Sequence, residues 1–195
     1  MCGIAGIYGP HEAGEREQML ERLVHRGPDD AGEAQLDAAW LGHRRLSIVD
    51  VDGGRQPFAN AAGDVWLVGN GEVYNHEQVR GTLAPAPFAT RSDNEVALHL
   101  LEERGPRGLA ELNGMFAFVM AAADGRFVAA RDAVGIKPLY WARRDGRVLA
   151  KTGVRPGAAL ARVDAPGVVA SARGRLSYLD DRQPLAYEAR PPVAA

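Results

Sequence analysis

Paired short apolar runs, each pair separated by a turn signal, fill the second half of the sequence. Three such pairs occur: residues 115–122 and 126–130 around Asp124-Gly125, 139–142 and 148–150 around Asp145-Gly146, and 168–171 and 176–179 around Arg173-Gly174. A Gly-containing turn between apolar runs is typical of a β-hairpin, because these residues tolerate the positive φ angles of tight turns. The pattern therefore predicts antiparallel sheets rather than a parallel, doubly wound sheet.

The first half of the sequence predicts further strands and two helices. Apolar runs predict strands at residues 3–8, 38–41, 46–49 and 65–68. Residues 15–24 place their apolar side chains on one helical face. A second helix follows Ser92 and stops at Gly105-Pro106, and Ser92 and Glu95 have the spacing of a capping box. Helices packed outside antiparallel sheets give an α+β fold.

Composition limits the classes of protein that fit. The 195 residues are 46% hydrophobic and 25% charged, which suits one globular domain, and the formal net charge of -2 indicates neither a nucleic-acid partner nor a membrane partner. No apolar stretch approaches the ~18 residues of a membrane span, and the N-terminus lacks a basic region typical of a signal peptide. A single cysteine excludes an internal disulfide, so we expect a cytoplasmic protein.

Cys2 is the main candidate for chemistry. The sequence contains no GxxxxGK[ST], HExxH or CxxC motif, and its five histidines lack metal-ligand spacing, so no metal or cofactor is expected. A lone cysteine is usually a small buried hydrophobe. Removal of Met1, however, would give Cys2 a free α-amine with an ordinary pKa near ~8, which can act as general base for its own thiol.

A set of motifs in a fixed order along the chain supports a catalytic role for Cys2. They are MCGIAGIYG, HRGPDD, HRRLSIVD, GNGEVYNH, RSDNEV, NGMFAF and RDAVGIKPLYW. Together they resemble the class II glutamine amidotransferase domain, most of all the glutaminase domain of asparagine synthetases. The resemblance implies a four-layer αββα sandwich of two antiparallel sheets, the Ntn-hydrolase fold. It implies this domain at 1–183 and, with the Pro- and Ala-rich composition, a loose tail at 184–195.

The resemblance also implies roles for five residues. Arg45 would hold the glutamine α-carboxylate, Asn70 and Gly71 would form the oxyanion hole, and Asp93, with Glu72 beside it, would receive the α-ammonium group. Residue type alone fits ordinary structural roles equally well. Arg45 could be a surface charge, Asn70-Gly71 a hairpin turn, and Asp93 a first-turn acid at a helix N-terminus.

Other residues of the motifs are expected to support the site. We expect Arg26, Asp29 and Asn75 to be structural supports around the pocket. Arg131 and Asp132 are expected to form a buried ion pair or hydrogen-bond network.

The resulting hypothesis is a glutaminase subunit that hydrolyses L-glutamine and passes ammonia to a separate synthetase or amidating partner. The ATP-dependent synthetase domain of the family, with its SGGxDS-type loop, is absent from this sequence. Residues 151–157 are turn-like where the family has a Ser-Glu-x-Lys segment, which supports an alternative, a non-catalytic glutamine-binding regulatory subunit. A third possibility is hydrolysis of another amide, and the pair Arg45 and Asp93 favours free glutamine over it.

Overall fold

The structure is a computed structural model of the 195-residue chain. It describes residues 1–47, 54–85, 87–144 and 146–153, and beyond them the backbone of strands at 161–162, 167–172, 175–180 and 184–187. In the part of the chain that it describes, no helix is long and apolar enough to cross a membrane.

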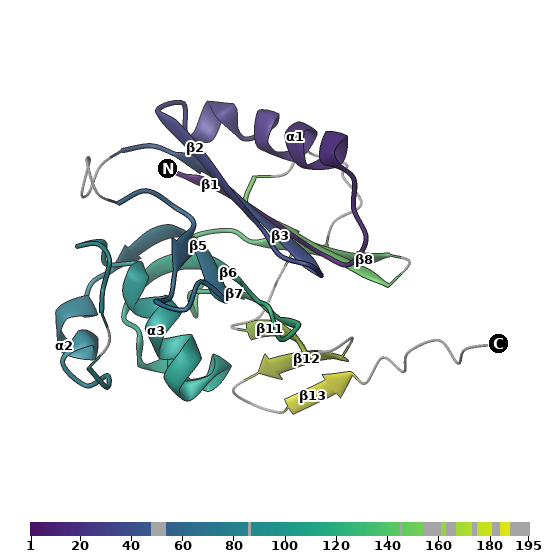
Figure 1. Ribbon diagram of the computed structural model, residues 1–195. Helices are drawn as coiled ribbons and strands as arrows, with labels where there is room; N and C mark the ends of the chain where they lie inside the picture. The colour runs from purple at the N-terminus through teal and green to yellow at the C-terminus, as the bar shows by residue number, and fades with distance from the viewer. Residues whose placement is uncertain are drawn as a thin grey trace.

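One sheet contains the N-terminal strand at its centre. Its order is β10-β8-β9-β1-β3-β2, and every neighbouring pair is antiparallel. The strands are β1 (Gly3–Tyr8), β2 (Asp30–Gln35), β3 (Ala39–Arg45), β8 (Tyr140–Arg144), β9 (Arg147–Lys151) and β10 (Ala161–Arg162). Helix α1 (Ala13–Glu21) covers the outer face of this sheet (Figure 1).

The second sheet has the order β13-β12-β11-β7-β6-β5-β4. Its strands are β4 (Phe58–Ala59), β5 (Val65–Val73), β6 (Gly114–Ala122), β7 (Arg126–Arg131), β11 (Gly167–Ala172), β12 (Arg175–Asp180) and β13 (Pro184–Tyr187). Its outer face carries α2 (His76–Arg80), α3 (Glu95–Arg104) and the 3-10 turn η2 (Pro106–Glu111) (Figure 1). The remaining element, the 3-10 turn η1 (Val24–Arg26), lies between α1 and β2. The α+β, four-layer αββα prediction is therefore confirmed.

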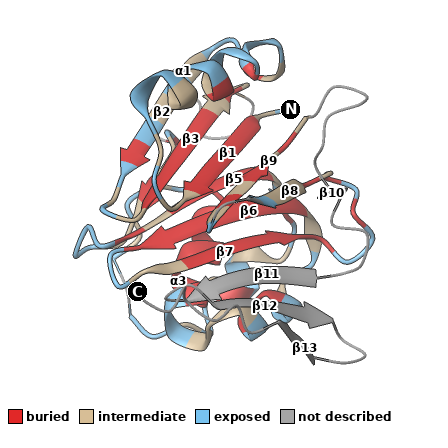
Figure 2. Ribbon diagram, turned by 90° about the vertical axis from the view of Figure 1, so that its right-hand side faces the viewer, coloured by how far each residue is buried: buried red, intermediate tan, exposed pale blue. Residues whose placement is uncertain are grey.

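Apolar side chains fill the space between the two sheets. The central strands of both sheets are buried along most of their length (Figure 2). Tyr8 and Phe127 approach to 5.8 Å between ring centroids, and a Cβ on Gly6 would lie 2.6 Å from Val119 Cγ1. Ile4 and Ala117 belong to the same core cluster. Gly6 thus lies opposite Val119, and Ile4 lies in the same cluster as Ala117. The first residues of β1 and of β6 are therefore at the same end of the sandwich.

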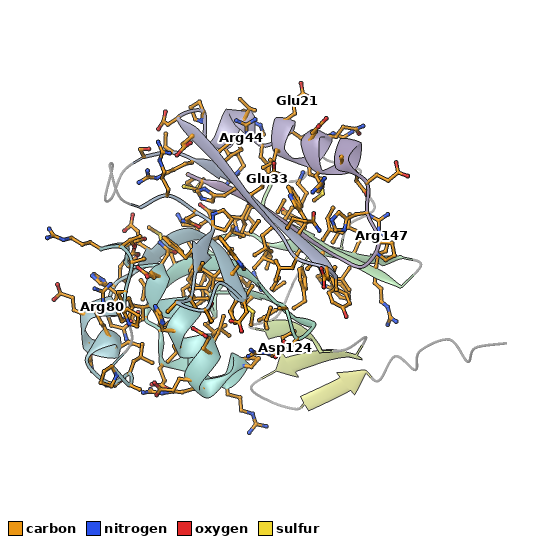
Figure 3. All side chains as sticks on the ribbon, in the orientation of Figure 1. Glu21, Glu33, Arg44, Arg80, Asp124 and Arg147 are labelled. Atoms are coloured by element: carbon orange, nitrogen blue, oxygen red, sulfur yellow. The ribbon has the colours of Figure 1, made fainter. Side chains whose placement is uncertain are left out.

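This alignment defines one end of the sandwich, which we call the site end. Here β1 and β6 begin, and β3, β5 and β7 end. The turns near Asp124 and Arg147, labelled in Figure 3, lie on the other side of the molecule from the N-terminus, which is marked in Figure 1.

The strands of the structure differ from those expected from the sequence in three places. The strand predicted at 46–49 is wrong at Leu46 and Ser47, which follow the end of β3, and residues 48 and 49 lie outside the described residues. Strand β2 was not predicted, because its polar composition hides it and its pairing with β3 stabilises it. In the expected loose tail, the first four residues form β13, which pairs with β12, and residues 188–195 lie outside the described residues.

Candidate active site

Cys2 lies at the site end, immediately before β1. Its side chain is half-buried, and its Sγ lies 3.5 Å from Leu46 N and 3.7 Å from Leu46 O. Arg26 Nε donates to Cys2 O at 3.2 Å. Burial lowers the pKa of Arg26 from its ordinary value, and the nearby Cys2 thiol and Tyr140 hydroxyl partly offset this effect. The nucleophile candidate is thus held at its sulfur and at its carbonyl.

The HRGPDD segment fixes the end of β3 beside Cys2. Asp29 N donates to Arg45 O at 3.0 Å, and Asp29 Oδ2 accepts from Ser47 N at 2.8 Å. A Cβ on Gly27 would lie 2.3 Å from Arg44 O, so only glycine fits this contact. Arg45 itself is 5% exposed, which rules out a plain surface charge. Asp29 and Arg26 are supports of the kind expected.

Asn70 and Gly71 lie within β5 and not in a turn. They pair with Ala117 and Phe116 of β6, so the hairpin-turn alternative is wrong. A continuous nine-residue strand with a neighbour overrides the local turn signal of the Asn-Gly pair. Asn70 is 2% exposed, and its Nδ2 has no hydrogen-bond partner in the part of the chain that the structure describes. A buried, unpartnered donor is costly, so it marks a place where a ligand atom can be bound.

The backbone of Gly71 points to the open edge of β5. Phe116, which pairs with Gly71, donates its N–H to Asp132 Oδ2 and accepts at its C=O from Asp132 N, both on the β7 side of β6. Gly71 therefore makes no backbone hydrogen bond to Phe116, and its N–H and C=O point to the opposite edge of β5. At the same edge, Gly69 N donates to Gln56 Oε1 at 2.6 Å and Val73 N donates to Asp93 Oδ2 at 2.6 Å. Between them, no acceptor is found for Gly71 N–H among the described residues. Two donors, Asn70 Nδ2 and Gly71 N–H, are thus available at the site end.

Asp93 is fixed against the end of β5. It is 7% exposed, and besides the bond from Val73 N its Oδ1 accepts from Asn94 Nδ2 at 3.0 Å. Helix α3 begins at Glu95, two residues after Asp93, with Asn94 as its N-cap. Asp93 is therefore outside the first turn, and its carboxylate binds strand backbone.

The predicted capping box is wrong. Glu95 does not reach back to Ser92, because its carboxylate accepts bonds from Ala89 N (2.6 Å), Thr90 N (2.8 Å) and Thr90 Oγ1 (2.7 Å). Burial alone would raise the pKa of Glu95, but hydrogen bonds from His99, Thr90 and Ala89 outweigh it, so the pKa of Glu95 is lowered. A fully buried carboxylate thus holds the segment that leads to Asp93.

The remaining predicted residues occupy the margin of the site. Glu72 lies near the end of β5, at the site end. Its side chain is exposed, whereas that of Asp93 is buried. Asn75 joins two segments, since its Oδ1 accepts from Asn113 N and its Nδ2 donates to Glu111 O. Asp132 accepts from three backbone N–H groups, those of Phe116, Ile136 and Lys137. The sequence analysis expected either a buried ion pair or a hydrogen-bond network for Arg131 and Asp132, and Asp132 belongs to a hydrogen-bond network.

Three residues near Cys2 were not predicted. Thr152 is fully buried, and its Oγ1 accepts from Ile4 N at 2.9 Å, which fixes the start of β1. Lys137 is buried, and its Nζ lies 3.5 Å from Met1 Sδ. His43 is buried at the β3–β5 contact, and burial followed by the charge of Arg45 lowers its pKa to about 4. Lys137 and His43 stand in motifs that the sequence shows, but only the fold reveals their surroundings.

The described residues form no cluster of metal-ligating side chains. No group of three or more His, Cys, Asp or Glu side chains in that part of the chain could hold a metal ion. Among the groups of the site end are a thiol, two donors that have no partner among the described residues, a buried arginine and a buried carboxylate.

Comparison with known proteins identifies the family. The family model described as the glutamine amidotransferase domain matches residues 1–180. The chain is 44% identical over 146 residues to asparagine synthetase [glutamine-hydrolyzing] 2 of Oryza sativa subsp. japonica, and also to asparagine synthetase [glutamine-hydrolyzing] 3 of Arabidopsis thaliana. Each match covers 72% of this chain and 25% of the relative, so the chain spans about a quarter of the length of these curated relatives.

Solved structures agree on the fold. The glutamine phosphoribosylpyrophosphate amidotransferase of B. subtilis has a TM-score of 0.71 at 20% identity, covering 92% of this chain and 49% of that one. A glutamine aminotransferase class-II domain protein of Silicibacter pomeroyi has a TM-score of 0.51 at 10% identity, covering 92% and 99%. The chain belongs to the glutamine amidotransferase domain family, an enzyme class with the Ntn-hydrolase fold. Its sequence relatives are of the asparagine synthetase type.

Proposed function

We propose that this protein hydrolyses L-glutamine to glutamate and ammonia, with the Cys2 thiol as nucleophile after removal of Met1. One observation carries the proposal. Two hydrogen-bond donors without a partner among the described residues, Asn70 Nδ2 and Gly71 N–H, lie at the same end of the sandwich as Cys2. A thiol that attacks a carbonyl needs hydrogen-bond donors for the oxyanion, and these two groups supply donors at the same end as the thiol.

The reaction has two steps. The Cys2 sulfur attacks the side-chain carboxamide carbon, and its proton passes to the Cys2 α-amine. Asn70 and Gly71 bind the oxyanion, and the C–N bond then breaks as the amine protonates the leaving ammonia. In the second step water attacks the thioester, giving glutamate and the free thiol.

Two charged residues account for selectivity toward free glutamine. The Arg45 guanidinium is suited to bind the α-carboxylate through two parallel hydrogen bonds. The Asp93 carboxylate is suited to bind the α-ammonium group. The burial of both side chains supports these roles, because a charge in a buried position interacts more strongly with a ligand.

Exposed apolar side chains support the further proposal that ammonia passes to a synthetase-type partner. Among residues whose burial is described, the exposed large hydrophobic ones are Met1, Val24, Tyr74, Val134 and Ile136. All belong to segments of the site end: the start of β1, η1, the end of β5, and the loop from β7 to β8. Met1 is lost from the proposed mature protein, and the other four side chains lie on separate segments of one end, which favours a protein partner at that end. Since three quarters of each curated relative lies outside the match, a glutamine-dependent synthetase is the partner that fits.

The test of glutamine hydrolysis is glutamate release by protein whose intact mass confirms loss of Met1. Wild type should release glutamate and ammonia in equal amounts, and Cys2→Ala should release neither. Equal release by wild type and Cys2→Ala would contradict the nucleophile. No release by wild type, together with measurable glutamine binding, would favour a non-catalytic subunit.

A further inference from the structure

Asn94 occupies a helix N-cap but does not act as a cap. An N-cap asparagine normally accepts a bond from a backbone N–H of the first helical turn. Here Asn94 precedes α3 with φ -72° and ψ -22°, and its side chain makes no capping bond. The residue is 6% exposed. Its buried amide must therefore serve another purpose.

The amide of Asn94 connects the two halves of the proposed site. Its Nδ2 donates to Asp93 Oδ1 at 3.0 Å and to Gly71 O at 3.1 Å. An amide NH2 group has two hydrogens, so these two bonds use its full capacity. Reversing the amide would set its oxygen against a carboxylate and a carbonyl, so the two acceptors fix its orientation.

The bond to Gly71 acts on the oxyanion donor. In a β-strand the N–H and C=O of one residue point to the same side. Because the Gly71 carbonyl is held at the open edge of β5, its N–H is held toward that edge as well. The oxygen of the Asn94 amide has no hydrogen-bond partner among the described residues, and it lies close to Gly69, since a Cβ on Gly69 would be 2.9 Å from it. Asn94 is thus packed against β5 on one side and bonded to it on the other.

We propose that Asn94 is a positioning residue that holds the carboxylate of Asp93 and the backbone of Gly71 at a fixed spacing. This inference rests on the proposed glutamine hydrolysis. It assigns Asn94 no contact with substrate. Glutamine would be bound at its α-ammonium group by Asp93 and at its reacting carbonyl by Gly71, and Asn94 would set the distance between those two groups.

The test compares Asn94→Ala and Asn94→Asp with wild type in glutamine hydrolysis. Loss of the two bonds should lower kcat/KM about tenfold in Asn94→Ala, with a rise in KM and a fall in kcat together. Asn94→Asp should be worse than Asn94→Ala, because its carboxylate would face Asp93 and the Gly71 carbonyl. A merely space-filling role predicts the opposite order, since aspartate matches asparagine in shape.

Asn60→Ala is the matched control. Asn60 also makes several side-chain bonds, to Asp64, Val65 and Glu102, but it lies at the opposite end of β5. It should lose stability without losing kcat/KM. If thermal unfolding shows that Asn94→Ala or Asn94→Asp does not fold, Asn94→Ser keeps one donor and should fall between wild type and the tenfold loss.

A double variant decides whether Asn94 acts on both groups. In an Asp93→Ala background, Asn94→Ala should still lower kcat, because the bond to Gly71 is lost independently. No further loss in that background would overturn the inference, since Asn94 would then act through Asp93 alone. Wild-type rates in Asn94→Ala would overturn it too. A wild-type protein without Cys2-dependent hydrolysis would instead overturn the proposed function, and this inference with it.

Discussion

Buried polar side chains at the site end are held mainly by backbone groups. Asp93 accepts a hydrogen bond from Val73 N–H, and Asp132 accepts hydrogen bonds from three backbone N–H groups. Backbone donors belong to the strands and loops themselves, so replacing one of these side chains leaves the donors in place. Single substitutions here should therefore separate charge from structure.

Asp93→Asn tests the α-ammonium site. The amide oxygen can still accept from Val73 N–H, so the fold should be kept while the charge is lost. We expect KM for glutamine to rise about 10- to 100-fold, with a smaller change in kcat. Steady-state kinetics measures both. Asp37→Asn, exposed in the turn between β2 and β3, should change neither, and an unchanged KM in Asp93→Asn would refute the role.

His43 should make stability depend on pH. Its pKa in the folded protein is about 4, below the ordinary 6.5, so the unfolded chain binds the proton first as pH falls. The stabilisation is present above pH 6.5 and is lost between pH 6.5 and 4, by about 3 kcal/mol at most. Urea unfolding across this range should show a steeper decline for wild type than for His43→Gln. Exposed His25→Gln should follow wild type, and parallel curves for wild type and His43→Gln would contradict a role for His43.

Strand β5 is the element that organises the site. Its inward face carries Asn70, and its open edge carries the N–H groups of Gly69, Gly71 and Val73. The motif containing Asn70-Gly71 was visible in the sequence, but the local pattern equally fitted a turn. Only pairing with β6 excludes that alternative. The spacing of Ser92 and Glu95 was misleading for a similar reason, because Glu95 is engaged by Ala89 and Thr90.

Gly71→Ala tests the fit of β5 against β6. Gly71 has φ +149°, and a Cβ would lie 1.9 Å from Met115 O and 2.6 Å from Phe116 Cα. We expect a loss of about 3 kcal/mol or more in the free energy of unfolding, and loss of hydrolysis. Gly63→Ala is the control, since Gly63 also has positive φ (+71°) but nothing within 4 Å. It should cost only about 1 kcal/mol, and similar losses for both would contradict the close contact.

Across the two sheets, the sequence predicted the layers better than their edges. Hairpins at Asp124-Gly125 and near Gly146 formed as expected, because local turn chemistry and apolar runs agree there. Polar β2 and short β4 form only by pairing with stronger neighbours, so nothing local marks them. The start of β1 and the ends of β3 and β5 lie together because the two sheets pack face to face, and no local sequence pattern predicts that packing.

The exposed apolar side chains at the site end predict that a substitution there weakens transfer of ammonia to the partner. Ile136 is 56% exposed in the loop from β7 to β8. With a synthetase-type protein from the same genome, Ile136→Asp should lower glutamine-dependent asparagine synthesis severalfold. Synthesis from added ammonia, and glutamine hydrolysis by the chain alone, should be unchanged. If the variant supports glutamine-dependent synthesis as wild type does, this surface is not where the partner binds.

Covalent trapping is the decisive test of Cys2 as an N-terminal nucleophile. A preparation containing both Met1-free and Met1-retaining protein is incubated with an electrophilic glutamine analogue and examined by intact-mass and peptide mass spectrometry. The Met1-free species should gain one adduct, located on Cys2, and excess glutamine should protect it, because the free amine activates the thiol. Labelling of both species alike, or no labelling of Met1-free Cys2, would contradict an N-terminal cysteine nucleophile.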